Sequence, residues 1–412
     1  MSLVIYNAAI LRGRWSGVEW AVWQRAVELS SGKSPNEFVF LVAEGVTLPS
    51  PLPGGHIVRL PRFVGTRLGR IFHELLLMPR LVRSTVQPFN RSTVLHQPDR
   101  NQGSGVRGQG KSLIAHLSSL IGYLLSPISY LLSPICDVGG REENSDTVLF
   151  APAFVAPPRL PCPFTLCLYD LHVFTHPQFC TLANRLHYRW RMPGSIRRAE
   201  TIEVPSGHVR DALLERFPRA AGKTVVRHLA LRDCYRHQVS DTEKAAVRDK
   251  YGLPSRYILF VGAPSPRKNL PAALAAWRAL RADGEDIGFV IAGNGEQETG
   301  NGNFTNQLSN RQTVKLSNHL GRSLLPPPVA LGYVPDADMP ALYACAEALL
   351  YPSFDEGYGL PIAEARACGC PVVTSAPTAR EIAPDAFLCG TDEASITSAL
   401  REAIAQGRRL QR

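Results

Sequence analysis

The sequence is short of charge, of paired cysteines and of uninterrupted apolar runs. Charged residues make up 19% of its 412 residues and hydrophobic residues 45%, whereas about a quarter of an average soluble protein is charged. This composition excludes a chain that is disordered as a whole, collagen-like or coiled-coil. At about 150 residues per domain, the length predicts two or three domains with a large core.

Cysteine pairs with the spacing of metal ligands are also lacking. The nine cysteines include no C-x-x-C pair, so we expect reduced thiols and no bound metal in a cytoplasmic protein. At the N-terminus, MSLVIYNAAILRGRW places its arginines after the apolar run. A signal peptide has its cations first, so this segment is interpreted as a buried strand.

The longest stretch without charged residues is 112–136, in which YLLSPIS is followed by YLLSPIC. Its length fits a membrane-spanning helix. Two prolines and its serines argue against a span, so a core segment or a surface-lying apolar insertion is favoured.

Charge is distributed unevenly along the chain. Residues 1–225 hold 25 Lys and Arg against 15 Asp and Glu, whereas residues 226–412 hold 20 of each. The whole excess of +10 therefore lies in the N-terminal half. This asymmetry predicts two domains with different partners, residues 1–225 and 226–412.

Both halves alternate apolar strands with helices. The expected strands are 3–9, 37–43, 56–60, 147–152, 164–170 and 201–206, then 256–262, 287–293, 329–334, 346–353 and 370–375. The expected helices are 18–29, 68–82, 182–198 and 209–217, then 270–282, 339–346, 361–367 and 395–405. Residues 99–146 are interpreted as an insertion, and 294–319 as a long polar loop. Strands that are apolar throughout predict parallel sheets covered on both faces, as in Rossmann-like domains.

Two short motifs are interpreted as chance matches to functional patterns. GVRGQGKS at 105–112 fits the phosphate-binding pattern G-x-x-x-x-G-K-[ST], with Lys111 as its lysine, but no apolar strand precedes it. Asp336 and Asp338 have the spacing of a metal-binding pair. Asp338 as a helix N-cap, with Pro340 in the first turn, explains the pair without a metal.

The most informative stretch is YPSFDEGYGLPIAEARACGCPVVTS at 351–375. A buried strand ends there, a glycine loop follows, and a helix begins near Pro361. The N-terminus of that helix is an anion site. Glu356 in the loop and Glu364 in the helix can each accept hydrogen bonds from a pair of hydroxyls, so together they suit a nucleotide sugar.

Two further strand ends support this interpretation. FVGAPSPRKNLPAAL at 260–274 places Arg267 and Lys268 after a parallel strand, where α/β sheets bind ligands, and these cations can neutralise a diphosphate. VIAGNGE at 290–296 ends in a turn of small residues.

Together these segments resemble the retaining glycosyltransferases of family 4 (glycosyl transferases group 1). The family pattern PS-x-x-EG-x-G-LP-x-x-EA-x-A-x-G-x-PVV-x-S matches PSFDEGYGLPIAEARACGCPVVTS at nearly every fixed position. The resemblance implies an α/β GT-B fold, in which two Rossmann-like domains with parallel sheets face each other across a cleft. The N-terminal domain would then bind the acceptor and the C-terminal domain the nucleotide sugar.

The resemblance also implies roles for single residues. Glu356 would contact the donor sugar, Glu364 the ribose, and Lys268 with Arg267 the diphosphate. The expected donor-binding set is completed by Gly17, Gly262, Gly293, Gly357, Tyr358, Gly359 and Leu360. Tyr169, Asp170 and His172 are assigned to the acceptor or sugar side.

This sequence departs from the family in three ways that the resemblance exposes. Ala263 replaces the arginine that often follows the strand glycine, so either Arg267 substitutes for it or this cation is missing. Tyr169 replaces a histidine that often precedes Asp170, so either His172 or His176 compensates or the contact with the sugar differs. Members usually continue past the position of Arg412 with a helix that returns to the N-terminal domain.

The predicted function is therefore transfer of a hexosyl group, with mannosyl favoured, from a nucleotide-diphosphate sugar to a glycan or polyprenyl-diphosphate-linked acceptor in surface polysaccharide synthesis. No cofactor is required, and GDP-mannose is the favoured donor. The basic N-terminal domain predicts peripheral contact with the inner membrane, and nucleic acid is not an expected partner. The alternatives are a P-loop nucleotide hydrolase using Lys111 and a catalytically idle GT-B binding protein.

Overall fold

The computed structural model describes residues 3–11, 17–31, 37–60, 62–65, 78, 147–158, 160–263, 265–293 and 326–410. Several predicted features lie outside these residues: the insertion 99–146 with Lys111 and the duplicated segment, the loop 294–319, and nearly all of the helix predicted at 68–82. No helix of the described part is long and apolar enough to cross a membrane.

The N-terminal half forms a seven-stranded parallel sheet in the order β3-β2-β1-β4-β5-β6-β7. Its strands are β1 (Leu3–Asn7), β2 (Glu37–Ala43), β3 (His56–Leu60), β4 (Thr147–Ala151), β5 (Phe164–Cys167), β6 (Thr201–Val204) and β7 (Thr224–Val226). Its α-helices are α1 (Gly17–Ser31), α5 (His172–Thr175), α6 (Leu182–Arg198) and α7 (Gly207–Arg216), with 3-10 turns η1 (Arg62–Gly65), η3 (Pro177–Phe179) and η4 (Pro218–Lys223).

Helix α1 packs on this sheet through a short apolar face. Val22 and Trp23 are buried with Tyr6 and Phe40, and the Tyr6 ring stacks on Phe150 at a centroid distance of 4.9 Å. The buried Tyr6 hydroxyl donates to the Val22 carbonyl (2.6 Å), so the polar tip of this core ring is satisfied.

The C-terminal half forms a six-stranded parallel sheet in the order β10-β9-β8-β11-β12-β13. Its strands are β8 (Tyr257–Val261), β9 (Gly288–Ala292), β10 (Val329–Gly332), β11 (Ala348–Tyr351), β12 (Val372–Thr374) and β13 (Phe387–Leu388). Its α-helices are α8 (Asp241–Tyr251), α9 (Leu270–Ala282), α11 (Met339–Ala344), α12 (Leu360–Ala367), α13 (Ala379–Ile382) and α14 (Glu393–Leu410), with 3-10 turns η5 (Asp233–Tyr235) and η6 (Pro266–Lys268).

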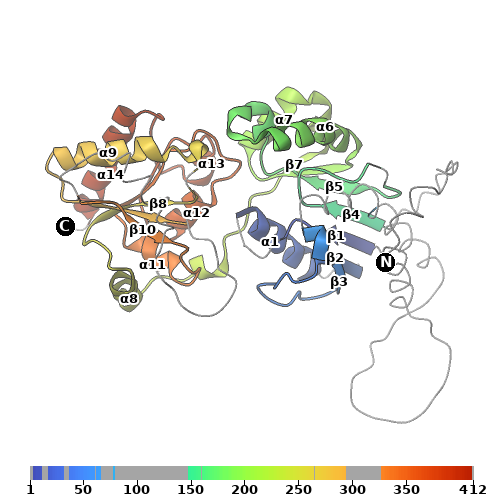
Figure 1. Cartoon of the computed structure of the whole chain (residues 1–412), viewed down its shortest axis with the longest axis horizontal. Coiled ribbons are helices and arrows are strands. Elements are labelled where there is room, and N and C mark those ends of the chain that lie inside the picture. The colour runs from blue at the N-terminus through green and yellow to red at the C-terminus, as the bar shows by residue number, and fades with distance from the viewer. Residues whose placement is uncertain are drawn as a thin grey trace, which may run out of the picture. The chain divides into compact units, whose positions relative to one another are not determined.

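Both faces of this second sheet are covered, because successive side chains of a strand point to opposite faces. In β8, Leu259 packs in the core shared with α11 and α12, whereas Ile258 and Phe260 pack in the core shared with α9 and α14. Figure 1 shows α9 and α14 on one side of the sheet and α11 on the other. The prediction of two parallel-stranded α/β halves is confirmed.

The strand order reverses direction between β8 and β11. Open α/β sheets bind ligands outside the carboxyl ends of their strands at such a switch point. The segments that follow these two strands are 262–269 and 352–359, which are the two predicted donor-binding loops. The fold therefore places them side by side.

Candidate nucleotide-sugar site

Glycines let the strand ends of the C-terminal sheet approach one another. Gly262 after β8 has φ +122° and Gly293 after β9 has φ +108°. A Cβ on Gly293 would lie 3.0 Å from the backbone of Gly262, and a Cβ on Gly262 would lie 3.3 Å from the Lys268 side chain. These positions therefore require glycine, both for their conformation and for space.

The turn η6 directs two cations toward one carboxylate. The ion pair from Arg267 Nη1 to Glu356 Oε1 spans 2.5 Å, and that from Lys268 Nζ to the same oxygen spans 3.0 Å. Tyr351 and Ser353 also donate their hydroxyls to Glu356 Oε1, each at 2.9 Å. The Lys268 ammonium contacts the Tyr351 hydroxyl and lies 4.0 Å from the centre of its ring.

Burial and charge set the ionisation of this cluster. Burial alone would raise the pKa of Glu356, but the facing Lys268 and Arg267 outweigh it and lower that pKa to about 2. Burial lowers the pKa of Lys268, and the Glu356 carboxylate only partly opposes this. Burial also acts to lower the pKa of Arg267, but Glu356 raises it overall. At neutral pH the Glu356 carboxylate is therefore ionised.

Helix α12 begins at the end of the glycine loop. Gly359 caps it with φ +93°, and Pro361 occupies its first turn, as the sequence predicts. Glu364 is 6% exposed and is already hydrogen bonded through both oxygens: Oε1 accepts from Arg232 Nη2 and Oε2 from the Tyr343 hydroxyl, each at 2.9 Å. The second predicted carboxylate is therefore held in a fixed orientation.

Arg232, which the sequence analysis does not identify, organises this second network. Its guanidinium contacts the Asp336 carboxylate, donates to the Tyr235 hydroxyl (2.8 Å) and lies 5.5 Å from the centre of the Trp20 ring. Burial acts to lower the pKa of Arg232, but Glu364 and its neighbours raise it overall. The residue stays charged and neutralises two carboxylates.

Replacing Arg232 by methionine is expected to lower the free energy of unfolding by about 3–5 kcal/mol, because Glu364 would be left as a buried charge without its counter-ion. Chemical denaturation measures this loss. The matched control is Arg236→Met, since Arg236 is exposed and pairs with the exposed Asp233. The control should change stability by at most about 0.5 kcal/mol. Equal effects of the two substitutions would contradict the assignment.

Both carboxylates of the Asp336–Asp338 pair form ion pairs. Asp338 occupies the N-cap position of α11 and Pro340 its first turn, as predicted, although the Asp338 side chain makes no capping hydrogen bond. Its carboxylate accepts from Lys250 Nζ and from the Tyr251 hydroxyl, each at 2.6 Å. Asp336 pairs with Arg232.

The glycine loop also meets residues of the N-terminal half. A Cβ at Gly357 would lie 1.7 Å from the Tyr169 carbonyl oxygen, so no side chain fits there. The Gly357 carbonyl accepts from Ser206 Oγ (2.6 Å), and a Cβ on Gly17 would lie 3.5 Å from Leu360 Cδ1. The structure therefore brings predicted residues of both halves together at this loop.

Asp355, directly before Glu356, is the centre of a histidine cluster. Its carboxylate lies 2.7 Å from His208 Nε2, 3.0 Å from His176 Nδ1 and 3.3 Å from His172 Nε2. Burial acts to raise the pKa of Asp355, but His172 and His208 outweigh it and lower it well below its ordinary value. Asp170 Oδ1 accepts from the His172 backbone N–H (3.1 Å) and orients that ring. Asp355 lies within the motif at 351–375, but nothing in the sequence predicts its three histidine partners.

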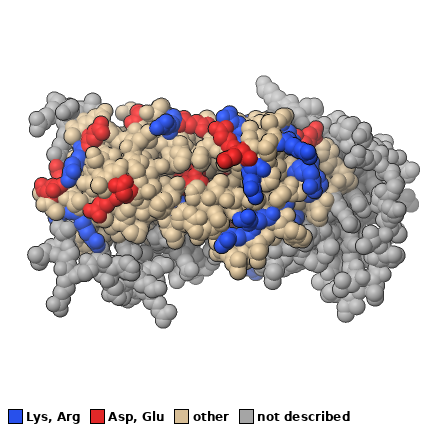
Figure 2. Space-filling model, turned by 90° about the horizontal axis from the view of Figure 1, so that it is seen from above, with Lys and Arg blue, Asp and Glu red and all other residues tan. Residues whose placement is uncertain are grey.

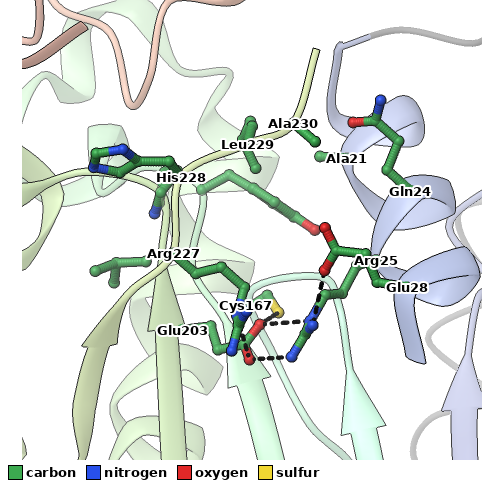
Figure 3. Close-up of a pocket in the computed structure, with 13 residues that line it drawn as sticks. Ala21, Gln24, Arg25, Glu28, Cys167, Glu203, Arg227, His228, Leu229 and Ala230 are labelled. Atoms are coloured by element: carbon green, nitrogen blue, oxygen red, sulfur yellow. Dashed lines mark hydrogen bonds and ion pairs between the residues drawn. The ribbon is translucent and has the colours of Figure 1, made fainter. Parts of the chain in front are cut away.

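A separate pocket lies in the N-terminal half, where β5, β6 and β7 end beside α1 (Figure 3). Glu203, buried at the end of β6, accepts from Arg25 Nη2 (2.6 Å) and from Arg227 Nε (3.1 Å). Figure 3 shows Arg25 reaching both Glu203 and Glu28. Tyr169, which the sequence assigns to the acceptor side, also lines this pocket.

Comparisons with known proteins identify the family of the part of the chain that contains this site. Residues 255–406, which contain both carboxylates and both cations, match the family model described as Glycosyl transferases group 1. This part of the chain is a group 1 glycosyl transferase domain. The predicted resemblance is thereby confirmed.

Two curated relatives are similar to this chain over a longer stretch than the group 1 domain. O-antigen chain mannosyltransferase B of Escherichia coli is 32% identical over 249 residues, which are 60% of this chain and 61% of that protein. O-antigen chain mannosyltransferase RfbU of Salmonella typhimurium is 22% identical over 240 residues, 58% of this chain and 60% of that protein. The chain thus spans less than two thirds of the length of these relatives.

Similarity to solved structures over nearly the whole chain establishes its fold. HepE of Anabaena, crystallised with UDP and glucose, has a TM-score of 0.61 at 16% identity and covers 99% of this chain and 95% of that one. WaaG, a glycosyltransferase involved in lipopolysaccharide biosynthesis, has a TM-score of 0.54 at 13% identity and covers 98% and 91%. The predicted GT-B fold is confirmed.

Proposed function

We propose that the chain is a retaining glycosyltransferase that moves a mannosyl group from GDP-mannose to a glycan or polyprenyl-diphosphate-linked acceptor in surface polysaccharide synthesis. The observation that carries this proposal is the buried cluster of Glu356 with Lys268 and Arg267 at the switch point between β8 and β11. The names of the two Escherichia coli and Salmonella relatives support the mannosyl donor.

The cluster suits a donor that carries both hydroxyls and a diphosphate. Lys268 and Arg267 stabilise the negative charge that develops on the departing nucleoside diphosphate, and the backbone N–H groups at 357–360 add to this at the start of α12. Glu356 keeps the cations in place without a donor and accepts hydrogen bonds from the sugar hydroxyls when one is bound. Glu364 does the same for the ribose hydroxyls.

The N-terminal half supplies the acceptor side in this proposal. Tyr169, Asp170 and His172 lie at the end of β5, next to Gly357 and Asp355. An acceptor hydroxyl held there against the donor sugar would react without any cofactor, because orientation supplies a large part of the rate enhancement. The polar pocket beside Tyr169 offers further hydrogen-bonding groups for a sugar.

The test is transfer from radiolabelled GDP-mannose to a panel of mannosyl oligosaccharides and polyprenyl-diphosphate-linked glycans, with UDP-glucose as the competing donor. We expect mannosyl transfer with the anomeric configuration of the donor retained, read by NMR of the first product formed. A product of inverted configuration would contradict the retaining mechanism. Faster turnover of UDP-glucose would contradict the donor, and no transfer from any nucleotide sugar would contradict the function.

A further inference from the structure

Helix α6 presents an apolar stripe to solvent. Leu182, Leu186 and Trp190 are 67%, 65% and 77% exposed. Residues four positions apart lie on one face of a helix, so these side chains form a continuous stripe two turns long. Among the residues that the structure describes, eight large hydrophobic side chains are exposed, and three of them are on this one face.

The opposite face fixes the helix to its domain. Met192 and Ile196 are buried, and the Ser195 hydroxyl accepts a hydrogen bond from the Ala156 backbone N–H (3.0 Å). The buried Arg191 donates to the Ala156 carbonyl (3.0 Å). Because these contacts hold α6 in one orientation, the apolar stripe cannot turn inward to bury itself.

The charged residues of the helix itself all have one sign. The helix sequence LANRLHYRWRMPGSIRR contains five arginines and neither Asp nor Glu. Arg189 and Arg197 are exposed and lie on the same side as the stripe, with Arg185 beside it. Figure 2 views the molecule from the side where α6 and α7 are uppermost in Figure 1, and Lys and Arg predominate on the part of that surface that they occupy.

This combination determines the chemistry of the partner. A helix with Leu and Trp on its exposed face and arginines around them fits the boundary between lipid headgroups and acyl chains, where indole rings and guanidinium groups both find favourable surroundings. Arginines on a helix that carries no acidic residue are attracted to anionic lipids. A polar protein surface would offer the apolar stripe no apolar contact. A cationic protein surface would repel the arginines.

We propose that α6 is a membrane-docking helix that lies flat on an anionic lipid surface and inserts Leu182, Leu186 and Trp190 below the headgroups. Helix α6 contains none of the residues of the nucleotide-sugar cluster. Membrane docking is therefore a property in addition to the proposed transfer reaction. Docking would hold the chain at the surface where a polyprenyl-diphosphate-linked acceptor resides.

The experiment is flotation of the full-length chain with vesicles of phosphatidylethanolamine and phosphatidylglycerol, with phosphatidylcholine vesicles as the uncharged comparison. We expect binding to the anionic vesicles that weakens as salt is added. The double variant Leu186→Ser/Trp190→Ser should bind about tenfold more weakly. Arg189→Gln/Arg197→Gln should lose the preference for anionic lipid. All variants should keep the wild-type melting temperature, since these side chains are exposed.

The control is Leu388→Ser, which removes an exposed apolar side chain (48%) on β13, outside α6, and should bind like wild type. Three results would overturn the proposal: no vesicle binding by the wild-type chain, binding that survives the α6 variants, or self-association through this face in sedimentation velocity. Transfer to a water-soluble acceptor is measured in parallel. If the wild-type chain bound the vesicles but transferred no sugar, the result would contradict the proposed function. It would not contradict the proposal that α6 docks on membranes.

Discussion

Replacing Lys268 by alanine is expected to lower kcat for sugar transfer by about 100- to 1,000-fold, the loss typical of removing one group that stabilises transition-state charge. The ammonium lies 3.0 Å from Glu356 in a buried cluster, so no solvent cation can replace it at that place. The affinity for the nucleoside diphosphate should fall as well. Steady-state kinetics with GDP-mannose and calorimetry with GDP measure the two effects separately.

The pH profile gives this prediction a second readout. Burial lowers the pKa of Lys268, so the ammonium is lost as pH rises through a value below its ordinary 10.5. Wild-type transfer should therefore decline on the alkaline side, and this decline should be absent in Lys268→Arg, whose guanidinium stays charged. The control Lys250→Ala removes a more exposed lysine paired with Asp338 and should leave kcat unchanged. Full activity in Lys268→Ala would refute its role.

Replacing Glu356 by glutamine should separate binding from transfer. The amide keeps the size of the side chain but removes the charge that balances Lys268 and Arg267. We expect kcat for transfer to fall about 100-fold, because an acceptor of sugar hydroxyl hydrogen bonds is lost. GDP binding should be kept or tightened, because the two cations then face the diphosphate without a competing carboxylate. This is opposite to the response expected of Lys268→Ala.

The same substitution has a pH signature in stability. The pKa of Glu356 is lowered to about 2, so its contribution to folding is present above its ordinary value of 4.5 and is lost as pH falls through about 2. Glu356→Gln should remove this acid-dependent contribution and lower the melting temperature of the ligand-free chain. Glu215→Gln is the control, since it neutralises an exposed glutamate of α7 and should leave the melting temperature unchanged. Weaker GDP binding by Glu356→Gln would contradict the account.

Most strands of the two sheets could be predicted from their apolar runs, but β7 and β13 were missed because they are only three and two residues long. The bounds expected for β2, β3, α6 and α9 agree with the structure at both ends. Helix α8 was not predicted. Val247 is its single buried residue, so its sequence lacks the periodic apolar positions that indicate a helix. Its signal was the capping box, in which Ser240 and Glu243 satisfy each other's backbone N–H groups.

The candidate site could be predicted in its parts but not in its connections. Glu356 stands in a motif 88 positions after Lys268, and their contact follows only once β8 and β11 are adjacent. Arg232 lies in the segment after β7, where no periodicity or spacing points to Glu364. Its function depends on a tertiary contact across 132 positions, which a single sequence does not reveal.

The most direct test of the central claim is a calorimetric titration of GDP-mannose into the wild-type chain and into Lys268→Ala. We expect saturable binding of one donor per wild-type chain and an affinity at least about tenfold weaker in the variant, because a buried charge pairing with phosphate is lost. Equal affinities in the two proteins would contradict the assignment of the diphosphate site. A wild-type chain that binds neither GDP-mannose nor any other nucleotide sugar would contradict the proposed function itself.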